Sequence, residues 1–197
     1  MPVIEHWTLR HGTPATLRPI HAGDAPALDA LIRVLSLEDR RRRFHGAISG
    51  VPPERLQEMV AVDPGREVAL VVLTGPAGRQ TLVADARYVV DATRRGAEFA
   101  LMVAGAWQRR GIGERAVAAL QRAAAAAGLR WLYGSVLADN APMLALMRHC
   151  GFLCTRSRVD RSLVSVEVGM DPQQRFAASP LTGSTSLAPF HRTALHA

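Results

Sequence analysis

A short glycine-bearing loop near the middle of the chain has the residues best suited to bind an anion. It reads QRRGIG over residues 108–113, and it lies between an apolar run, Phe99 to Ala104, and a run of strong helix formers, Glu114 to Ala127. The first amides of a helix have no partner within the helix, and the helix dipole adds partial positive charge, so phosphate binds well there. Gly111 and Gly113 let the backbone approach a ligand closely. The sequence therefore predicts a phosphate-binding strand–loop–helix unit.

A second segment follows the same order of elements. The apolar run Trp131 to Leu137 predicts a strand, and Asn140 then precedes a predicted helix from Ala141 to Cys150 that ends at Gly151-Phe152. Asparagine is among the residues preferred at a helix N-cap. Asn140 therefore has two compatible interpretations, as the N-cap of its helix and as a hydrogen-bonding group for a ligand.

These motifs resemble those of a known family. QRRGIG is similar to the Q/R-x-x-G-x-G/A signature of the GNAT acetyltransferase superfamily, which binds the pyrophosphate of acetyl-CoA, whereas the residues of the dinucleotide fingerprint and of the P-loop are missing. The segment from Asn140 to Phe152 is similar to the N-x-x-M/A and G-F close of the same family. TLRPIHAGDAPAL, LSLEDRRRRF, AEFALMVAGAWQRRGIG and NAPMLALMRHCGF together resemble bacterial Pat-type protein lysine acetyltransferases, over about Trp7 to Phe152.

The resemblance implies an α/β (α+β) fold of the GNAT type. Its mixed, mostly antiparallel central sheet has about seven strands with flanking helices, and a splayed strand pair binds acetyl-CoA. Alternation and apolar runs predict strands at Trp7–Arg10, Ala15–Ile20, Val68–Leu73, Thr81–Val90, Phe99–Ala104, Trp131–Leu137, Leu153–Val159 and Leu163–Gly169. Helical spacing predicts a helix with apolar positions from Ala27 to Leu35, capped by Asp24, and a second helix over Ser36–Phe44, capped by Ser36. Further helices are predicted over Glu54–Val62 and at the two positions named above.

The same resemblance assigns the coenzyme site. Met102 and Val103 would lie along the acetyl-CoA arm, and Asn140 and Met143 would lie beside its pantetheine part. The pyrophosphate would be held by Gln108, Arg109, Arg110, Gly111, Ile112 and Gly113. Acetyl-CoA is then a co-substrate, and no metal is expected.

Acetyl transfer to an amine also requires a base. A lysine ammonium has a pKa near 10.4, so almost none of it is nucleophilic at neutral pH. Glu98 opens the central strand, and in Pat-like enzymes the corresponding glutamate acts as general base, directly or through a water. The alternative is a surface-facing glutamate that pairs with Arg94 or Arg95.

Other acid and base candidates are weaker. Glu114 and Glu167 are lesser candidates, and Glu114 also suits the helix N-terminus electrostatically. Many GNAT enzymes have a tyrosine acid where this chain has Met147, which has no proton to donate. The general acid is therefore unassigned, with water as the default.

Length and composition predict one globular domain over residues 1–170. The 197 residues are 48% hydrophobic, no apolar run approaches the length of a membrane span, and residues 1–10 lack the apolar core of a signal peptide. Cys150 and Cys154 have no matching Cys/His group, so they are read as free thiols in a cytoplasmic setting. Residues 171–197 are rich in Ser, Thr, Pro and Ala, which predicts a disordered or loosely attached tail.

The net charge of +7 comes entirely from arginine, because the chain has 24 arginines and no lysine. The single run, Arg40 to Arg43, predicts either a solvated helix face or a contact to coenzyme phosphates or an acidic protein surface. Nucleic acid is not an expected partner, since no aromatic interleaving or reading motif accompanies the charge. A membrane partner is not expected either.

The sequence thus predicts an acetyl-CoA-dependent N-acetyltransferase that acts as a monomer or homodimer. The acceptor is a primary amine, first of all a protein lysine. Two alternatives stay open: a GNAT enzyme for a small-molecule amine such as an amino acid, polyamine or drug, and a non-catalytic acyl-CoA-binding module.

Overall fold

A computed structural model describes residues 4–10, 12–44 and 50–171 of the chain. Apart from Asp171, the tail predicted for residues 171–197 lies outside the described residues.

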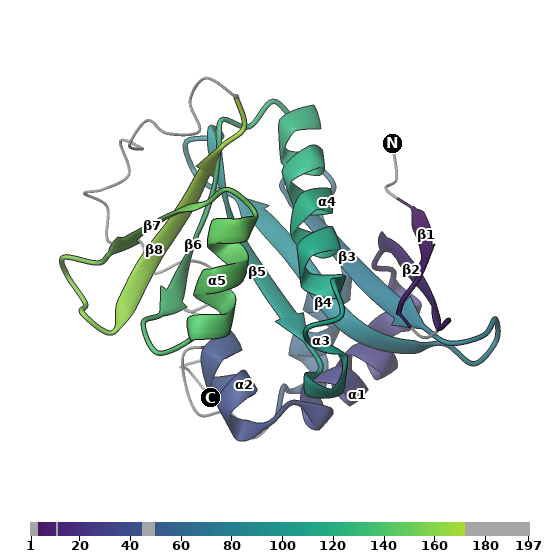
Figure 1. Cartoon of the computed structure of the whole chain (residues 1–197). Coiled ribbons are helices and arrows are strands. Elements are labelled where there is room, and N and C mark those ends of the chain that lie inside the picture. Colours follow the sequence, from purple (N-terminus) through teal and green to yellow (C-terminus); the bar gives the residue numbers. More distant parts are fainter. Residues whose placement is uncertain (1–3, 11, 45–49, 172–197) are drawn as a thin grey trace.

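The described residues form one mixed sheet in the strand order β1-β2-β3-β4-β5-β6-β8-β7 (Figure 1). The strands are β1 (Glu5–Thr8), β2 (Pro14–Pro19), β3 (Glu67–Thr74), β4 (Thr81–Val90), β5 (Gly96–Val103), β6 (Trp131–Leu137), β7 (Leu153–Arg156) and β8 (Leu163–Gly169). Every neighbouring pair is antiparallel except β5 and β6, which are parallel. The predicted mixed, mostly antiparallel sheet is confirmed, with eight strands where about seven were expected.

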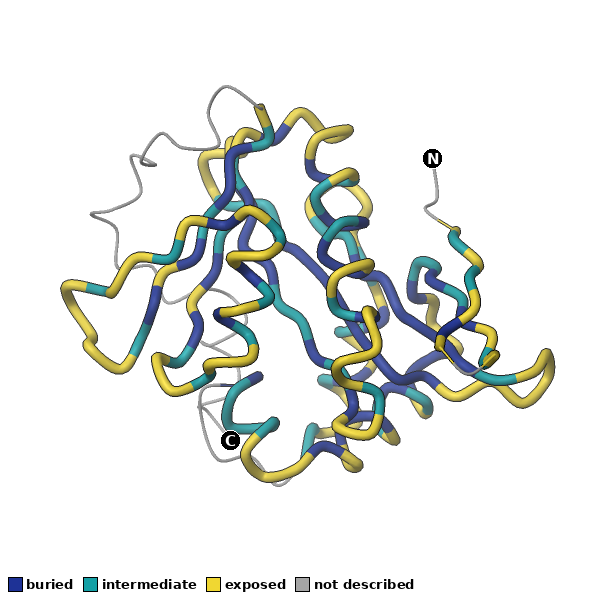
Figure 2. Tube along the Cα trace, in the orientation of Figure 1, coloured by how far each residue is buried: buried dark blue, intermediate teal, exposed yellow. Residues whose placement is uncertain are grey.

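Helices cover both faces of this sheet. They are α1 (Ala25–Val34), α2 (Leu37–Phe44), α3 (Pro53–Val60), α4 (Ile112–Ala126) and α5 (Ala141–His149), with short 3₁₀ turns η1 (Ala22–Asp24) and η2 (Gly105–Trp107). One core contains α4 and α5, and the other contains α1 and α3. Figure 2 shows the buried strands running through the centre, with exposed turns at the periphery.

The two cores explain the apolar run in β3. Leu70 and Val72 point into the core under α4, while Ala69, Val71 and Leu73 point into the core under α1. Successive side chains of a strand point to opposite faces, so a strand covered on both faces must be apolar at every position.

Most boundaries differ from the prediction by no more than two residues, and three strands differ most. β1 spans Glu5–Thr8 instead of Trp7–Arg10. β5 begins at Gly96 instead of Phe99. β7 ends at Arg156 instead of Val159, because the Ser157 hydroxyl accepts hydrogen bonds from the amides of Val159 (3.3 Å) and Asp160 (3.1 Å) and turns the chain. Serine side chains commonly bond to the backbone in this way and compete with strand pairing.

The role expected for Asp24 also differs. Its carboxylate does not cap α1. It instead accepts two hydrogen bonds from the Arg18 guanidinium, each 2.7 Å, and one from the His21 amide at 2.9 Å. Asp24 thereby fastens the end of β2 to the start of α1, and these contacts outweigh burial and lower its pKa.

The divergence of β5 and β6 determines where the cavity described below lies. The two strands pair only where Gly96–Glu98 lie beside Trp131–Tyr133. Gly134 then lies against Phe99, and a Cβ at Gly134 would come within 3.2 Å of the Phe99 carbonyl oxygen. Beyond this contact the strands splay apart, and the N-terminal ends of α4 and α5 lie at the open end of the splay (Figure 1).

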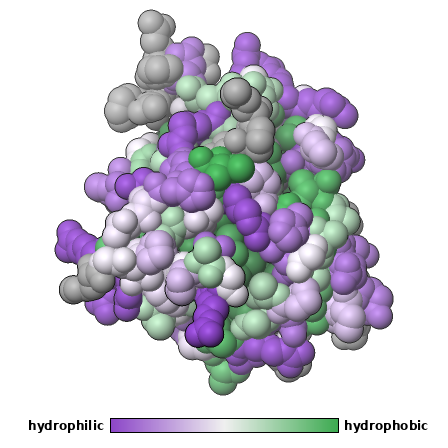
Figure 3. Space-filling view, turned by 90° about the vertical axis from the view of Figure 1, so that its right-hand side faces the viewer, coloured by the Kyte–Doolittle hydropathy of each residue, from purple (hydrophilic) through white to green (hydrophobic). Residues whose placement is uncertain are grey.

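On the side of the molecule with β1 and β2, hydrophilic and hydrophobic side chains are interspersed (Figure 3). There β1 is fastened to α4 by an ion pair between Glu5 and Arg122 and by the Arg115 guanidinium, which lies 5.0 Å from the ring centroid of Trp7. Among the described helices, none combines the length and apolar character needed to cross a lipid bilayer.

Candidate active site

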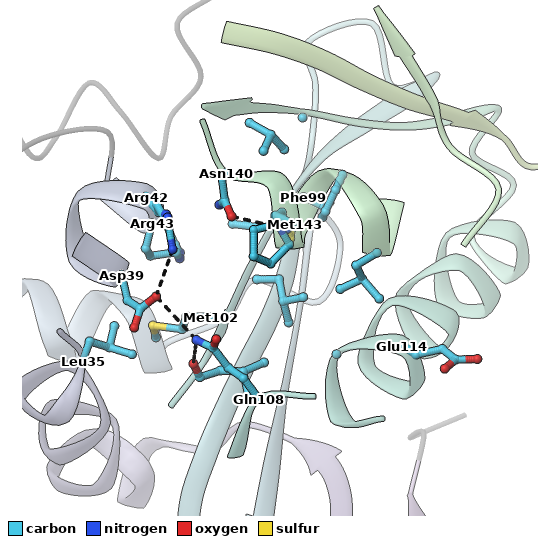
Figure 4. A pocket seen from close by; sticks show the side chains of 18 of the residues that line it. Leu35, Asp39, Arg42, Arg43, Phe99, Met102, Gln108, Glu114, Asn140 and Met143 are labelled. Carbon is cyan, nitrogen blue, oxygen red and sulfur yellow. Dashed lines mark hydrogen bonds and ion pairs between the residues drawn. The ribbon is translucent and has the colours of Figure 1, made fainter. Parts of the chain in front are cut away.

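A cavity of about 400 Å³ occupies the space between the splayed strands. Its walls come from five parts of the chain: the end of α1 with α2, β5, the loop before α4, β6, and the start of α5 (Figure 4). The lining residues that bear on the chemistry are Leu35, Asp39, Arg42, Arg43, Glu98, Met102, Val103, Gln108, Arg109, Gly111, Gly113, Glu114, Asn140 and Met143.

The loop before α4 presents backbone amides to this cavity. Arg109 and Gly111 both have left-handed backbone conformations, with φ of 57° and 80°. Gly111 is the N-cap of α4 and has no side chain that could cap the first amides. An uncapped helix N-terminus at a cavity wall binds anions through those amides and the helix dipole.

The two glycines of the loop serve different purposes. A Cβ at Gly111 would meet no protein atom within 4 Å, so only its backbone conformation and the space for a ligand call for glycine. A Cβ at Gly113 would approach Leu146 Cδ2 to 3.0 Å and Leu101 Cδ2 to 3.6 Å. Gly113 therefore lets α4 pack closely against α5 and β5.

The side chains of the loop separate into two groups. Gln108 lines the cavity, and its Nε2 donates to the Val103 carbonyl at 3.1 Å and to Asp39 Oδ1 at 3.4 Å. Arg110 and Ile112 do not line the cavity. The Arg110 guanidinium lies 4.9 Å from the ring centroid of Trp107, and the side chain of Ile112 is buried in the core.

Asn140 and Met143 lie together at the other wall. Asn140 is the N-cap of α5, and its Oδ1 accepts a hydrogen bond from the Met143 amide at 3.3 Å. Both residues also line the cavity (Figure 4). The capping role is thus observed, and it leaves Asn140 within reach of a ligand in the cavity.

Glu98 lies in the same cavity and is 7% exposed. Burial raises its pKa from an ordinary value of 4.5 to about 7, and the nearby positive charge of Arg43 opposes that rise. Arg94 and Arg95 are both exposed at the preceding turn. The alternative of a surface-facing glutamate is therefore wrong, because β5 starts two residues before Glu98 and places its side chain inside.

The other acid and base candidates lie elsewhere or have other contacts. Glu114 lines the cavity, but its carboxylate pairs with His149 Nε2 at 3.2 Å. Glu167 lies on β8, opposite Tyr133 in the ladder, and is not part of the cavity lining. Met147 is fully buried in the core.

The sequence did not assign the contribution of α2 to the site. Ser36 caps α2, as predicted, since its hydroxyl accepts from the Asp39 amide at 3.0 Å. Arg42 and Arg43 face the cavity from α2, opposite Glu114 (Figure 4). Arg43 is only 8% exposed, so for this residue the solvated-face interpretation of the arginine run is wrong. The one available signal was the helical period, which turns one arginine of any such run inward.

Comparisons with known proteins agree with this geometry. The acetyltransferase (GNAT) domain family matches residues 15–153. An acetyltransferase of Pseudomonas aeruginosa is 27% identical over 162 residues, which are 81% of this chain and 87% of that protein. The GNAT domain of Streptomyces lividans PAT superposes with a TM-score of 0.75 at 24% identity, covering 84% of this chain and 96% of that one.

A further solved structure contains the coenzyme. A putative acetyltransferase of Salmonella typhimurium, with its cofactor acetyl-CoA, has a TM-score of 0.65 at 19% identity and covers 80% of this chain and 95% of its own. The chain therefore belongs to the GNAT acetyltransferase family. It is an N-acetyltransferase with acetyl-CoA as co-substrate.

The cavity fits this co-substrate. Its wall has an uncapped helix N-terminus for the pyrophosphate, and the diverging edges of β5 and β6 suit the amides of the pantetheine arm. Among the described residues, no group of three or more His, Cys, Asp and Glu side chains is arranged to hold a metal ion.

Replacement of Gly111 by valine is expected to weaken acetyl-CoA binding at least tenfold. A β-branched side chain strains the left-handed backbone and occupies the space beside the amides. Titration calorimetry measures the affinity, and circular dichroism checks the fold. Gly128→Val is the matched control, since Gly128 also has a left-handed φ of 72° but lies at the far end of α4. Equal affinity in wild type and Gly111→Val would contradict the assignment.

Glu98→Gln is expected to increase the free energy of unfolding at pH 8. The folded state raises the pKa of Glu98 to about 7, so its stabilisation is complete below pH 4.5 and is lost as the pH rises through 7. At about 1.4 kcal/mol per pH unit, the wild type loses on the order of 3 kcal/mol that the neutral glutamine keeps. Urea denaturation at pH 5 and pH 8 checks this, and a stability difference that is independent of pH would contradict it.

Proposed function

We propose that this enzyme transfers the acetyl group of acetyl-CoA to a lysine side chain of a protein, with Glu98 as general base. The observation that supports it best is the position of Glu98. A buried carboxyl group with a pKa of about 7 lies in the same cavity as the uncapped N-terminus of α4. The base and the anchor of the co-substrate are therefore on one surface.

The expected reaction is a direct transfer. Ionised Glu98 takes a proton from the lysine ammonium, directly or through a water, and the freed amine nitrogen attacks the thioester carbonyl carbon. A new C–N bond forms and the C–S bond breaks. The nitrogen then loses its second proton, directly or through water, to the coenzyme A thiolate that leaves. A base works best when its pKa lies near the working pH, and burial places Glu98 there.

The rim of the cavity supports a large acceptor. Leu35 lines the cavity, and its chain neighbours Val34 and Leu37 are 68% and 76% exposed. Contiguous exposed apolar surface marks contact with another macromolecule, and we propose that these two side chains contribute to such a surface. The likeness to the GNAT domain of Streptomyces lividans PAT and the resemblance of the sequence to Pat-type enzymes support the same acceptor.

The remaining assignments stay proposals. Met147 cannot serve as the general acid, so we propose water for that role. The proposed acetyltransferase domain spans residues 1–170, and the free Cys150 and Cys154 fit the cytoplasmic setting expected from the sequence.

A panel of acceptors tests the function. We expect turnover of acetyl-CoA with lysine-containing proteins to exceed that with free amino acids, polyamines and aminoglycoside drugs at equal amine concentration. Thiol release measures the rate, and mass spectrometry locates the acetyl group on the acceptor. The enzyme itself has no lysine, so acetyl-lysine in the mixture comes from the acceptor alone. Faster turnover of a small amine would replace the protein-lysine assignment.

Glu98→Gln is expected to lower kcat/KM about 10²–10⁴-fold at pH 7, because it removes the base and keeps the shape. This corresponds to roughly 3–5 kcal/mol of activation free energy. The wild-type profile of kcat/KM should rise with pH through about 7 as Glu98 ionises, and the variant should lack this limb.

The coenzyme dissociation constant serves as the control for this variant. It should stay within about twofold of wild type, since Glu98 is remote in sequence from the loop at residues 108–113. Full activity of the variant at pH 7 would remove Glu98 from the mechanism. A loss of coenzyme binding would assign it a structural role.

A further inference from the structure

Five charged side chains among the described residues are buried. Asp24 pairs with Arg18 at the start of α1, and the other four lie on the α1–α3 side of the sheet. They are Asp85 and Arg87 on β4, Glu98 on β5, and Arg43 at the end of α2. Asp85 is fully buried and Arg87 is 4% exposed. Charges are rarely buried unless they are paired, so this group calls for an explanation.

Two of the four neutralise each other. Arg87 donates from Nε and Nη2 to the two carboxylate oxygens of Asp85, at 2.9 and 2.5 Å, and from Nη1 to the Met59 carbonyl at 3.0 Å. A bidentate arginine–carboxylate contact of this kind satisfies both partners. Asp85 raises the pKa of Arg43 and Arg87 lowers it, so the effects of this pair on Arg43 oppose each other.

The remaining two residues, Arg43 and Glu98, have charges of opposite sign. Both line it, and both are more than nine-tenths buried. Burial lowers the pKa of Arg43 to about 10, so it remains protonated at pH 7. Arg42 on α2 lines the cavity as well, Arg55 on α3 acts on Arg43, and the charges of Glu98 and Asp91 both act on Tyr133 of β6.

None of these other groups can replace Arg43. Arg42 pairs with Glu38 at 3.0 Å, and Arg55 pairs with Glu58 at 2.5 Å. Burial raises the pKa of Tyr133, as do the charges of Asp91 and Glu98, so Tyr133 is neutral at pH 7.

The placement of Arg43 depends on contacts of α2 with both walls of the cavity. Arg41 Nη2 donates to Asp139 at 2.6 Å, just before α5, and Asp39 accepts from Gln108 at 3.4 Å in the loop before α4. The Arg43 guanidinium also lies 5.0 Å from the ring centroid of Phe44, which is itself buried. α2 is thereby held across the open end of the splay, with Arg43 facing inward (Figure 4).

We propose that Arg43 is a positioning residue for the transfer reaction: it supplies the buried positive charge that lets a substantial fraction of Glu98 ionise inside the cavity at neutral pH. This inference rests on the proposed role of Glu98 as general base. Without Arg43, burial would leave Glu98 protonated, and a protonated carboxyl group cannot accept the proton of the ammonium. Arg43 acts through Glu98 and needs no contact with the acceptor.

The test compares Arg43→Met, which removes the charge, with Arg43→Lys, which keeps it. A nearby opposite charge lowers a carboxyl pKa by about 1–3 units. In Arg43→Met we therefore expect the rising limb of kcat/KM against pH to move up by about one pH unit or more, with at least about a fivefold loss of kcat/KM at pH 7. Arg43→Lys should return the limb close to its wild-type position. Arg55→Met, which removes a nearby arginine outside the cavity lining, should leave the limb unmoved.

A second readout separates this inference from the proposed function. A ¹³C NMR titration of the glutamate carboxyl groups, with Glu98→Gln to assign the resonance, reports the ionisation of Glu98 without reference to activity. An unchanged Glu98 titration in Arg43→Met would overturn the role of Arg43. If the Glu98 titration shifts in Arg43→Met but the pH profile of kcat/KM does not, Arg43 controls the ionisation of Glu98 and Glu98 is not the base. That result would overturn the proposed mechanism.

A folding defect in Arg43→Met is also informative. The double variant Arg43→Met/Glu98→Gln removes both complementary charges. If the pair is coupled as proposed, the double variant should unfold at a higher urea concentration than Arg43→Met alone at pH 8. Equal loss of stability in the single variant and in the double variant would assign Arg43 a packing role and overturn the proposal.

Discussion

The divergence of one parallel strand pair is the constraint on which the site depends. β5 and β6 share three residue pairs and then separate beyond the contact of Gly134 with Phe99. Backbone groups along the diverging edges and the cavity between them become available to a ligand. The N-terminal ends of α4 and α5 lie at the same open end, because each helix follows one of the two strands directly.

The splay also explains why a carboxylate can be buried at Glu98. This residue occupies the last paired position before the strands separate, so its side chain reaches the cavity while the sheet and α2 exclude most solvent. Burial of a charge at this position therefore lowers the stability of the fold, and a well-packed apolar residue would not have this cost. Residues that are strained or poorly solvated in this way are common at catalytic sites, where function outweighs stability.

α2 contacts the loop before α4 and also lines the cavity that contains Glu98. Asp39 accepts a hydrogen bond from Gln108 in the loop before α4, Arg41 contacts Asp139 two residues before α5, and Arg43 lines the cavity together with Glu98. The helix has eight residues and a strongly polar composition, so contacts of its polar side chains hold it in place as much as burial of Phe44 does. A shift of α2 would change the electrostatics at Glu98 without altering the sheet.

The local pattern of the sequence determined most of the elements and the glycine-bearing loop to which anion binding is assigned. The continuous apolar run around Leu70, the glycines after β5 and the asparagine before α5 each have a short-range physical cause, so each could be read without coordinates. Asp24 bonded to Arg18 rather than capping α1, because the fold brings the end of β2 beside the start of α1. The Ser157 turn that shortened β7 is local, and the apolar pattern alone did not reveal it.

What only the tertiary structure decided is the surroundings of the reactive group. The sequence nominated Glu98, but whether it is exposed beside Arg94 or buried beside Arg43 depends on where α2 packs. Arg43 and Glu98 are separated by more than fifty positions in the chain, and no periodicity relates them. A pKa depends on burial and on every nearby charge, and both are properties of the packed molecule. The sequence therefore determined which group could act as the base, and the fold decided the pH at which it is ionised.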